Sequence, residues 1–515
     1  MSLIGRTGPL PNPTAHPTDC GGESVSTTIV EYDLFINGEW VSPVAGRRYP
    51  TANPYTGETW AQVGDADDAD VDRAVKSART ALSGVWGTMT GFDRAALMRK
   101  LAELLRRDAA RLAKLESRDS GKLLREMSTQ TAYLPSWFDY FGGVADKIQG
   151  STIPSDRPNF LVYTEEVPVG VVAAIVPWNS PLMLLVWKLA PAIAAGCTIV
   201  VKPSDQTPVT ALELALLFEE AGFPPGVFNV VTGNGPRVGQ ALSAHPKVDK
   251  IAFTGSTATG ALVAAAAAKN LTRVSLELGG KSAQIVFEDA DVEATVNGII
   301  SGVFAATGQT CMAGARLLVH ENMHDEVVRR VVARAETIVL GDPTEEATEM
   351  GPVNNQTQLA KITSMLEQAK AEGASFACGG PGGDTKGYFV RPTVVTNVSL
   401  DSALYREEVF GPVLAVATFT SEDEAVAMAN ATEFGLAAGI WTVDVRRAHR
   451  VARQLRAGTV WINAYRVVAP NVPFGGFGQS GIGRESGVDA VREFTETRAT
   501  WVELSGATRD PFTIG

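Results

Sequence analysis

A carboxylate and a thiol stand 34 residues apart in the middle of this chain. Glu277 ends the apolar run V-S-L-E, and Cys311 lies among small residues in G-Q-T-C-M-A-G. The thiolate is the reactive form of cysteine, and an unperturbed thiol with a pKa of about 8.5 is only a few per cent ionised at neutral pH. A buried carboxylate with a raised pKa can take a proton from the thiol or from water. The pair predicts a thiol nucleophile with a base beside it.

Each of these residues also has a purely structural interpretation. A free cysteine such as Cys311 is often an inert, packed thiol. Glu277 could be a strand-end residue exposed to water, because an unpaired carboxylate is costly to bury. A cysteine hydrolase would need a histidine partner, and none of the five histidines lies in a comparable motif.

Length and charge restrict the possible functions. At 515 residues the chain exceeds the size at which single cores stop growing, so two or more domains are expected. A formal net charge of −12 argues against nonspecific binding to nucleic acid or to an anionic membrane. We expect small-molecule partners or further copies of the same chain.

Cysteine and histidine usage favours a reducing, cytoplasmic location without a metal centre. Cys20, Cys197, Cys311 and Cys378 are too few and too scattered for a disulfide framework, and no C-x-x-C pair is present. The sequence has no H-E-x-x-H motif, which argues against a zinc site.

Two stretches resemble targeting or membrane segments only superficially. Residues 1–28 are rich in Pro, Thr, Ser and Gly, with no basic or apolar region, which predicts a flexible extension instead of a secretory signal. Residues 167–187 include 21 uncharged positions, but Pro168, Pro177 and Pro181 suit a buried strand, a turn and a helix better than a membrane span.

The elements that must position the chemistry follow an alternating pattern. Short strands are expected over 31–62 and helices around 70–85 and 93–117. From residue 170, apolar strands alternate with helices of 10–15 residues, beginning near 181, 208, 236 and 257, which predicts a doubly wound parallel sheet. Ligands bind beyond the carboxyl ends of such strands. Polar residues fall at these ends: Asn179, Lys202, Thr254 to Ser256, and Glu277.

A second alternating region spans residues 283–465 and carries the cysteine. Its strands are expected at R-L-L-V-H, Y-F-V-R-P-T-V-V, V-L-A-V-A-T-F and T-V-W-I-N, with a helix from about 323. A last strand is expected over 497–504. The sequence therefore predicts two α/β domains followed by a C-terminal β-strand.

Seven motifs in order carry a specific resemblance. They are P-W-N-S-P (177–181), V-K-P-S-D (201–205), F-T-G-S-T-A-T-G (253–260), E-L-G-G-K (277–281), G-Q-T-C (308–311), E-E-V-F-G-P-V (407–413) and P-F-G-G-F-G-Q-S-G-I-G-R-E (473–485). With these motifs the chain resembles the aldehyde dehydrogenase superfamily over roughly residues 30 to 505.

The resemblance implies an α/β fold with two doubly wound parallel-sheet domains and a small β oligomerisation arm. The implied division is a flexible extension over 1–28, a Rossmann-like cofactor domain over 29–147 and 167–277, a catalytic domain over 278–480, and an arm and tail over 148–166 and 490–515. A homo-oligomer, dimer or tetramer, is implied through strand pairing by the arm.

The resemblance also implies a hydrolytic reaction that converts an aldehyde to a carboxylic acid. Cys311 would attack the aldehyde, Asn179 and the Cys311 N–H would stabilise the oxyanion, and Glu277 would activate water. Lys188 and Glu485 match positions proposed to relay protons, although such charges are more often surface or structural ion pairs. An acylating enzyme using coenzyme A generally lacks the base, and a noncatalytic protein on the same scaffold would be expected to lack the thiol or the base.

NAD is the implied cofactor, with NADP possible. In the family, a lysine and a carboxylate hold the adenosine ribose; here they are Lys202 and Asp205, and the aspartate is shorter than the usual glutamate. The G-x-G-P-x-x-G of Gly233, Gly235 and Gly239 is one residue longer than the usual fingerprint. The implied cofactor residues are Pro177, Trp178, Lys202, Ser204, Asp205, Gly235, Phe253, Thr254, Gly255, Ser256, Gly260, Leu278, Glu408 and Phe410.

Four residues fall where the family lines its aldehyde tunnel: Trp187, Ser180, Tyr465 and Val472. Ser180 replaces a frequent aromatic residue, which indicates a roomier or more polar pocket without identifying a substrate. A semialdehyde or betaine-aldehyde type of enzyme that prefers NADP is the alternative.

Overall fold

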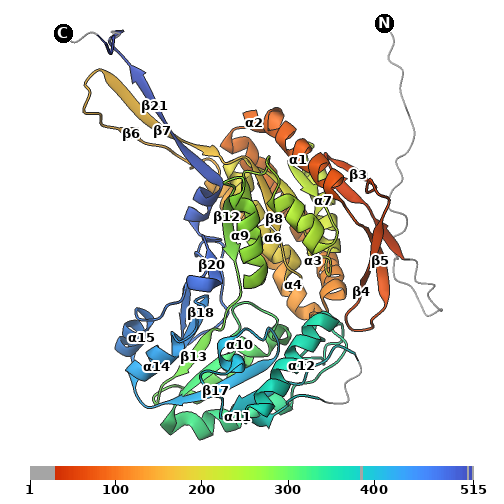
Figure 1. Cartoon of the computed structure of the whole chain (residues 1–515), viewed down its shortest axis with the longest axis vertical. Helices are drawn as coiled ribbons and strands as arrows, with labels where there is room; N and C mark the ends of the chain where they lie inside the picture. The colour runs from red at the N-terminus through yellow and green to blue at the C-terminus, as the bar shows by residue number, and fades with distance from the viewer. Residues whose placement is uncertain (1–28, 383–386, 507–509, 513–515) are drawn as a thin grey trace.

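The computed structural model describes residues 29–382, 387–506 and 510–512. The extension over 1–28, with Cys20, lies outside the described residues. The described chain forms two lobes, each built on one large sheet, and an arm that projects from the upper lobe (Figure 1).

An eight-stranded sheet forms the centre of the upper lobe, in the order β20-β12-β11-β8-β9-β10-β2-β3. Its middle strands are parallel, and β20, β2 and β3 pair antiparallel at the two edges. The strands are β2 (Leu34–Ile36), β3 (Glu39–Val41), β8 (Val171–Ile175), β9 (Thr198–Lys202), β10 (Phe228–Val230), β11 (Lys250–Thr254), β12 (Arg273–Glu277) and β20 (Gly481–Ile482). Strands β8 to β11 are buried along their whole length, as expected of a sheet covered on both faces.

Helices cover both faces of this sheet. Successive residues of β8 point to opposite faces, so Val172 packs into one core cluster and Val171 into another. The first cluster takes side chains from α3 (Gly91–Ser120), α6 (Pro181–Ala195) and α7 (Val209–Ala221), and the second from α1 (Asp68–Leu82) and α9 (Thr257–Ala268). The short helices nearby are α2 (Val85–Thr88), α4 (Leu124–Tyr133), α5 (Pro135–Val144) and α8 (Gln240–Ser243). The doubly wound arrangement is confirmed.

The lower lobe holds a seven-stranded sheet in the order β15-β16-β17-β14-β13-β18-β19, parallel except for β15. Its strands are β13 (Ala283–Val286), β14 (Arg316–His320), β15 (Ser375–Cys378), β16 (Thr393–Thr396), β17 (Val413–Phe419), β18 (Ala437–Trp441) and β19 (Thr459–Ile462). Its helices are α10 (Val292–Val303), α11 (His324–Glu336), α12 (Gln356–Ala371), α13 (Ala403–Arg406), α14 (Glu422–Ala429) and α15 (Val445–Ala452).

Two small sheets complete the fold. Strands β1 (Val30–Tyr32), β4 (Arg48–Ala52) and β5 (Thr59–Gly64) form one of them. In the other, β7 (Phe160–Pro168) pairs antiparallel with both β6 (Thr152–Ile153) and β21 (Thr495–Glu503). This second sheet is the arm seen at the upper left of Figure 1.

Two expected elements differ in the structure. The helix expected from about 236 is a single π-turn over Gly235–Gly239 followed by the four residues of α8, because glycine and proline interrupt this segment. The strand expected at 388–395 begins only at Thr393, since Pro392 precedes it and cannot donate to a ladder. The remaining alternating elements lie within a few residues of their expected positions.

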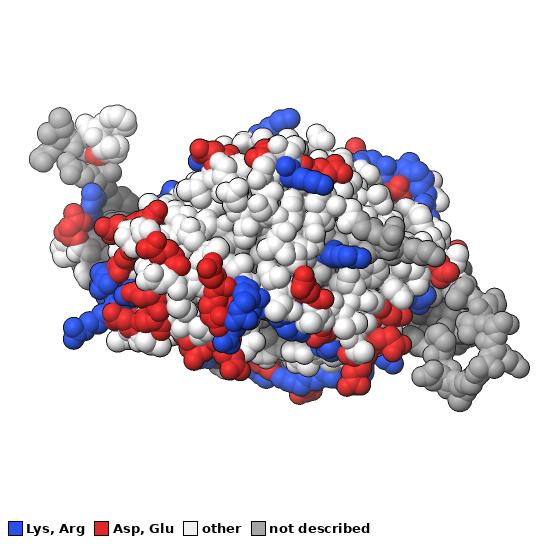
Figure 2. All heavy atoms as spheres, turned by 90° about the horizontal axis from the view of Figure 1, so that it is seen from below, with Lys and Arg blue, Asp and Glu red and all other residues white. Residues whose placement is uncertain are grey.

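The uncharged stretch over 167–187 forms the end of β7, then β8 and the first half of α6. Among the described residues, no helix has both the length and the apolar character that crossing a membrane requires. On the face shown in Figure 2, Lys and Arg side chains are interspersed with Asp and Glu, and no continuous basic patch covers it.

Candidate active site

Cys311 lines a cavity between the two lobes. The cavity has an empty volume of about 580 Å³ and receives residues from the ends of β8, β11 and β12 and from the lower lobe. Its lining contains ten of the residues singled out in the sequence: Pro177, Trp178, Asn179, Thr254, Gly255, Ser256, Leu278, Cys311, Glu408 and Phe410. Cys311 therefore borders the cleft and is only partly buried.

The loop before Cys311 has an unusual backbone. Ala306, Thr307 and Gly308 all have positive φ, at 55°, 57° and 66°. A Cβ atom on Gly308 would lie 2.1 Å from the carbonyl oxygen of Gly411, so only glycine fits there. The Asn179 amide donates through Nδ2 to the Gln309 carbonyl oxygen at 3.0 Å. The Asn179 side chain is thereby fixed beside the cysteine segment.

The environment of Cys311 disfavours its thiolate. Burial raises the pKa of Cys311 to about 12, and the carboxylates of Glu408 and Glu277 add to this rise. The free enzyme therefore keeps this thiol protonated at neutral pH, and a nucleophile is formed only when a base takes the proton or a positive charge comes near.

Glu277 is buried at the end of β12, where it is 5% exposed. A Cβ atom on Gly475 would lie 2.7 Å from Glu277 Oε1, so the carboxylate faces this glycine, and Glu277 is not part of the Cys311 cavity lining. Its Oε2 has no hydrogen-bond partner among the described residues. Burial raises the pKa of Glu277 well above its usual range, the Glu485 carboxylate raises it further, and the Lys188 ammonium lowers it.

Lys188 and Glu485 form a buried ion pair next to Glu277. The Lys188 ammonium donates to Glu485 Oε1 and to the Thr254 hydroxyl, and Lys188 is 1% exposed. The other Glu485 oxygen, Oε2, is buried and, like Oε2 of Glu277, has no partner in the described part of the chain. The Glu485 carboxylate thus acts electrostatically on the Glu277 carboxylate, since it raises the pKa of Glu277.

A second group of residues, on the 408–410 segment and the loop after β8, lines the same cavity. Glu408 Oε1 accepts a hydrogen bond from the Gly280 N–H at 3.0 Å, and burial raises the pKa of Glu408. The rings of Trp178 and Phe410 meet edge to face, with centroids 5.3 Å apart. Phe410 has a φ of 58°, which is rare for a bulky residue and is held by its neighbours.

Three residues from α12 and the segment before it were not found by reasoning on the sequence. Gln358 and Lys361 line the same cavity. Gln358 Nε2 donates to the carbonyl oxygens of Val409 and Phe410 at 2.9 and 3.0 Å, and Lys361 Nζ donates to that of Glu408 at 2.7 Å. Asn354 donates through its N–H to Gln309 Oε1 at 2.9 Å. No local pattern marks them, because only the tertiary fold brings α12 to the 408–410 segment.

Lys202 lies at the end of β9, apart from the Cys311 cavity. It is 3% exposed, and its Nζ lies 3.8 Å from the position that a Cβ atom on Gly235 would occupy. Burial lowers the pKa of Lys202 to about 8, and the nearby Asp205 carboxylate opposes this shift. Asp205 and Gly235 thus lie near Lys202 at the carboxyl edge of the sheet. Ser204 Oγ accepts only a local bond, from the Gln206 N–H.

The glycine loop after β11 is shaped by packing. Ser256 caps α9 by accepting a hydrogen bond from the Thr259 N–H at 3.2 Å. A Cβ atom on Gly260 would lie 2.4 Å from a methyl group of Leu278, and one on Gly255 would lie 2.5 Å from the ring of Phe253. These two glycines bring α9 close to the strands, with its free N–H groups at the cavity.

The four expected tunnel residues have different surroundings. Trp187 stacks on Trp137 with centroids 5.6 Å apart and is almost fully buried. The Tyr465 hydroxyl donates to the Met312 carbonyl oxygen at 2.9 Å. Val472 is 51% exposed at the surface, whereas Ser180 is 8% exposed and bonded to Lys122.

The family model described as "Aldehyde dehydrogenase family" matches residues 40–500 of this chain. The chain belongs to the aldehyde dehydrogenase family. As a member of it, the protein is an enzyme that oxidises aldehydes and uses NAD(P) as cofactor.

Known aldehyde dehydrogenases resemble this one over almost their full length. The (Z)-2-((N-methylformamido)methylene)-5-hydroxybutyrolactone dehydrogenase of Acinetobacter baylyi is 46% identical over 488 residues, which cover 94% of this chain and 99% of that protein. Aldehyde dehydrogenase 1A1 of Homo sapiens is 47% identical over 92% of this chain and 95% of its own.

Two solved structures of aldehyde dehydrogenases also resemble this chain over nearly its whole length. The NAD+ complex of an aldehyde dehydrogenase from Bacillus cereus has a TM-score of 0.91 at 45% identity and covers 92% of this chain and 97% of its own. Betaine aldehyde dehydrogenase from Staphylococcus aureus, also in complex with NAD+, has a TM-score of 0.92 at 39% identity, with coverages of 94% and 96%.

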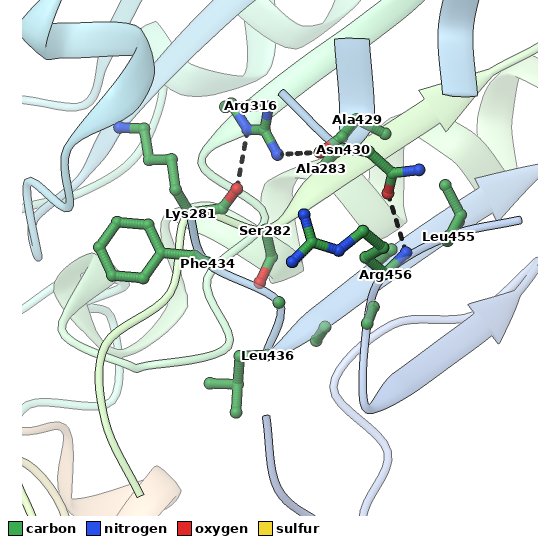
Figure 3. A pocket seen from close by; sticks show the side chains of 14 residues that line it. Lys281, Ser282, Ala283, Arg316, Ala429, Asn430, Phe434, Leu436, Leu455 and Arg456 are labelled. Carbon is green, nitrogen blue, oxygen red and sulfur yellow. Dashed lines mark hydrogen bonds between the residues drawn. The ribbon is translucent and has the colours of Figure 1, made fainter. Parts of the chain in front are cut away.

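A further cavity of this aldehyde dehydrogenase lies behind the E-L-G-G-K segment (Figure 3). Arg316 spans it, donating to the carbonyl oxygens of Lys281 at 2.7 Å, Met428 at 2.9 Å and Ala429 at 2.7 Å. The side chain of Lys281 points away from Arg316 (Figure 3). Because its hydrogen bonds go to backbone oxygens on both sides, Arg316 braces the segment that follows Glu277.

Proposed function

We propose that this enzyme oxidises an aldehyde to a carboxylic acid by the hydrolytic route, with Cys311 as nucleophile, Glu277 as base and NAD as the preferred cofactor. The observation that carries the proposal is the single cavity in which the Cys311 thiol, the Asn179 amide and the Glu408–Phe410 segment meet. A noncatalytic protein on this scaffold would have no reason to keep a thiol open to that cavity and a buried base behind it.

Carbon–sulfur bond formation is the first chemical step. The Cys311 sulfur attacks the aldehyde carbon, the thiol proton passes to water in the cleft, and the carbonyl oxygen gains negative charge. One hydrogen of the Asn179 amide is used on the Gln309 oxygen, which orients the group and leaves the other hydrogen for the substrate. This second amide hydrogen and the Cys311 N–H together form an oxyanion hole. Each such donor contributes a factor of about 10²–10³ to the rate.

The residues present fit NAD(P). Lys202 and Asp205 would hold the adenosine ribose, the capped start of α9 at Ser256 would face the pyrophosphate, and Glu408 with Phe410 would hold the nicotinamide end. When bound, the cofactor supplies the acceptor for the hydride that leaves the thiohemiacetal carbon, and a thioester remains on Cys311. Asp205 disfavours a 2′-phosphate, which supports NAD over NADP.

Hydrolysis requires the base. Glu277, with its raised pKa, takes a proton from the water that attacks the thioester, and the carbon–sulfur bond breaks to release the acid. The proton can then pass to the unpartnered oxygen of Glu485, which Lys188 holds in place. This arrangement supports a proton relay that leads from the cleft through Glu277 to the buried ion pair of Glu485 and Lys188. Water is the acyl acceptor in preference to coenzyme A, since Glu277 has no role in the acylating route.

The same proposal includes a homo-oligomer of two or four chains, formed through the arm over 148–166 and 490–515. Trp501 and Leu504 are 55% and 63% exposed there, and β21 lies at a free edge of the arm sheet, which favours pairing with another copy. The cofactor domain is assigned to 29–147 and 167–277 and the catalytic domain to 278–480, each of which holds one of the large sheets.

Replacing the nucleophile tests the function directly. Cys311→Ala should abolish NADH formation with a panel of aldehydes, because no thiohemiacetal can form, while NAD affinity measured by calorimetry stays within about threefold. Cys197→Ala, at a buried thiol outside the cavity, is the matched control. Appreciable turnover by the Cys311 variant would overturn the mechanism.

Replacing the base separates the two halves of the reaction. Glu277→Gln should retain a rapid first turnover of NADH and then slow by about 10²-fold or more, because the thioester is no longer hydrolysed with a base. Stopped-flow absorbance gives both phases. A steady-state rate unchanged from that of the wild type at saturating substrate would count against Glu277.

A further inference from the structure

The helix start that follows Asn179 is held by another helix. Ser180 is the N-cap residue of α6; all of α6 lies within the described residues, yet none of its N–H groups donates to the Ser180 hydroxyl. A serine in this position usually accepts such a bond. Here Ser180 Oγ accepts from Lys122 Nζ at 3.0 Å, and Glu116 Oε1 accepts the Leu182 N–H at 3.4 Å. Side chains of residues 116–126, the α3–α4 corner, therefore fix the residues after Asn179.

The α3–α4 corner also fixes the loop that leads to Cys311. Glu126, in the first turn of α4, accepts the Ala306 N–H through Oε1 at 3.0 Å. Ala306 and Thr307 have positive φ, a conformation that non-glycine residues keep only where their neighbours fix it. The Glu126 carboxylate is one of the groups that stabilise this strained path of the chain toward Cys311.

The backbone of the α3–α4 corner is itself tied to its surroundings. Gly121 ends α3 with a φ of 76°. Ser117 Oγ donates to the Lys122 carbonyl oxygen at 2.6 Å. The Leu124 N–H donates to the carbonyl oxygen of Pro343, in the lower lobe, at 2.8 Å. The side chains of Lys122 and Glu126 therefore extend from a fixed part of the chain.

The two segments fixed by the corner carry the two proposed donors of the oxyanion hole. The Asn179 amide already contacts the cysteine segment, through its bond to the Gln309 carbonyl oxygen at 3.0 Å. Among the described residues that line the cavity are Asn179 and Cys311, but neither Lys122 nor Glu126. Lys122 and Glu126 therefore act on the cavity through the two segments that they bind.

We propose that Lys122 and Glu126 are positioning residues that set the geometry of the oxyanion hole. Lys122 fixes the segment that carries the Asn179 amide, and Glu126 fixes the loop that carries the Cys311 N–H. The α3–α4 corner keeps these two donors at a constant separation. This inference rests on the proposed function, since it concerns the oxyanion that forms when Cys311 attacks the aldehyde. A displacement of about 1 Å in a catalytic site can cost about 10²-fold in rate.

Variants of Glu126 test the positioning of the loop. Glu126→Ala should slow the first turnover of NADH, measured by stopped-flow absorbance, by about tenfold or more, with NAD affinity within about threefold of the wild type. Glu126→Gln should restore the rate to within about threefold, because the amide oxygen also accepts the Ala306 N–H. Arg125→Ala is the matched control, since its guanidinium donates to the Glu346 carbonyl oxygen, away from both segments, and it should leave the rate unchanged.

A double-mutant cycle tests the positioning of the amide. Lys122→Met keeps the length of the side chain, removes its bond to Ser180 and should slow the first turnover by about tenfold. In an Asn179→Ala background the same change should cost less than about threefold, because no amide remains to be positioned. Alkylation of Cys311 by iodoacetamide forms no oxyanion, so its rate should change by less than about threefold in Lys122→Met and in Glu126→Ala.

Several results would overturn the positioning role while leaving the function intact. They are an unchanged first turnover in Glu126→Ala, a loss in Glu126→Gln equal to that in Glu126→Ala, and equal losses from Lys122→Met in the two backgrounds. If Lys122→Met fails to fold, the Glu126 variants decide the question. No NADH from any aldehyde of a broad panel with the wild type would overturn the proposed function itself.

Discussion

At the scale of single residues, the thiol and the base are both held in the forms that do not react by themselves. Burial keeps the Cys311 thiol protonated, and by raising the pKa of Glu277 it favours the protonated carboxyl over the carboxylate that acts as a base. The protein alone therefore does not supply a resting thiolate. A catalytic pair of this kind is protected from alkylation and oxidation until the site is filled.

The raised pKa of Cys311 predicts a pH dependence. Because only the thiolate reacts, alkylation of the cofactor-free enzyme by iodoacetamide should accelerate about tenfold for each pH unit between pH 7 and 9, without a plateau. Mass spectrometry of the modified peptide reports the rate at this residue, and Cys311→Ala provides the background. A plateau below pH 9 would contradict the pKa of about 12.

At the scale of elements, a two-residue strand positions the base. β20 pairs with β12 so that Gly481 lies opposite Glu277, and the Leu278 N–H donates to the Ser480 carbonyl oxygen at 3.0 Å. The Ser480 hydroxyl donates to the Gly279 carbonyl oxygen at 2.7 Å. A segment some 200 positions later in the chain thus fixes the direction in which the E-L-G-G-K turn leaves the sheet.

Gly481→Ala tests this support. Gly481 has a φ of 137°, and a Cβ atom there would lie 1.9 Å from the Leu276 carbonyl oxygen, so both strain and a backbone clash are expected. The variant should lose at least about 2 kcal/mol of stability and most of its activity. Gly222→Ala, with a φ of 88° but open space around it, is the matched control and should lose only about 1 kcal/mol. Equal losses in the two melting curves would contradict a role for the close contact.

At the scale of the whole molecule, the reaction site is assembled from both lobes. The upper sheet brings Asn179, Thr254 and Leu278 to the cleft at its carboxyl edge, and the lower lobe brings Cys311 and Glu408. Parallel strands place their following loops on one edge, which explains why residues more than 200 positions apart line one cavity.

We expect assembly of the oligomer to depend on a few apolar side chains of the arm. The double variant Trp501→Asp, Val502→Lys should lower the mass measured by light scattering, because both exposed residues lie on β21 at the free edge of the arm. Phe92→Asp changes an apolar residue outside the arm that is even more exposed, at 72%, and should leave the mass unchanged. A mass equal to that of the wild type in the double variant would contradict assembly through the arm.

The amino-acid sequence by itself determined the two alternating sheets, their order along the chain and the presence of a thiol and a carboxylate at strand ends, because these depend on local periodicity and on motifs of a few residues. It did not reveal Gln358 and Lys361, the orientation of Glu277 toward Gly475, or the bond between Lys122 and Ser180. Those features depend on contacts between segments distant in the chain. Only the packing of the two lobes decides which side chains meet, since no local pattern encodes which helix faces which loop.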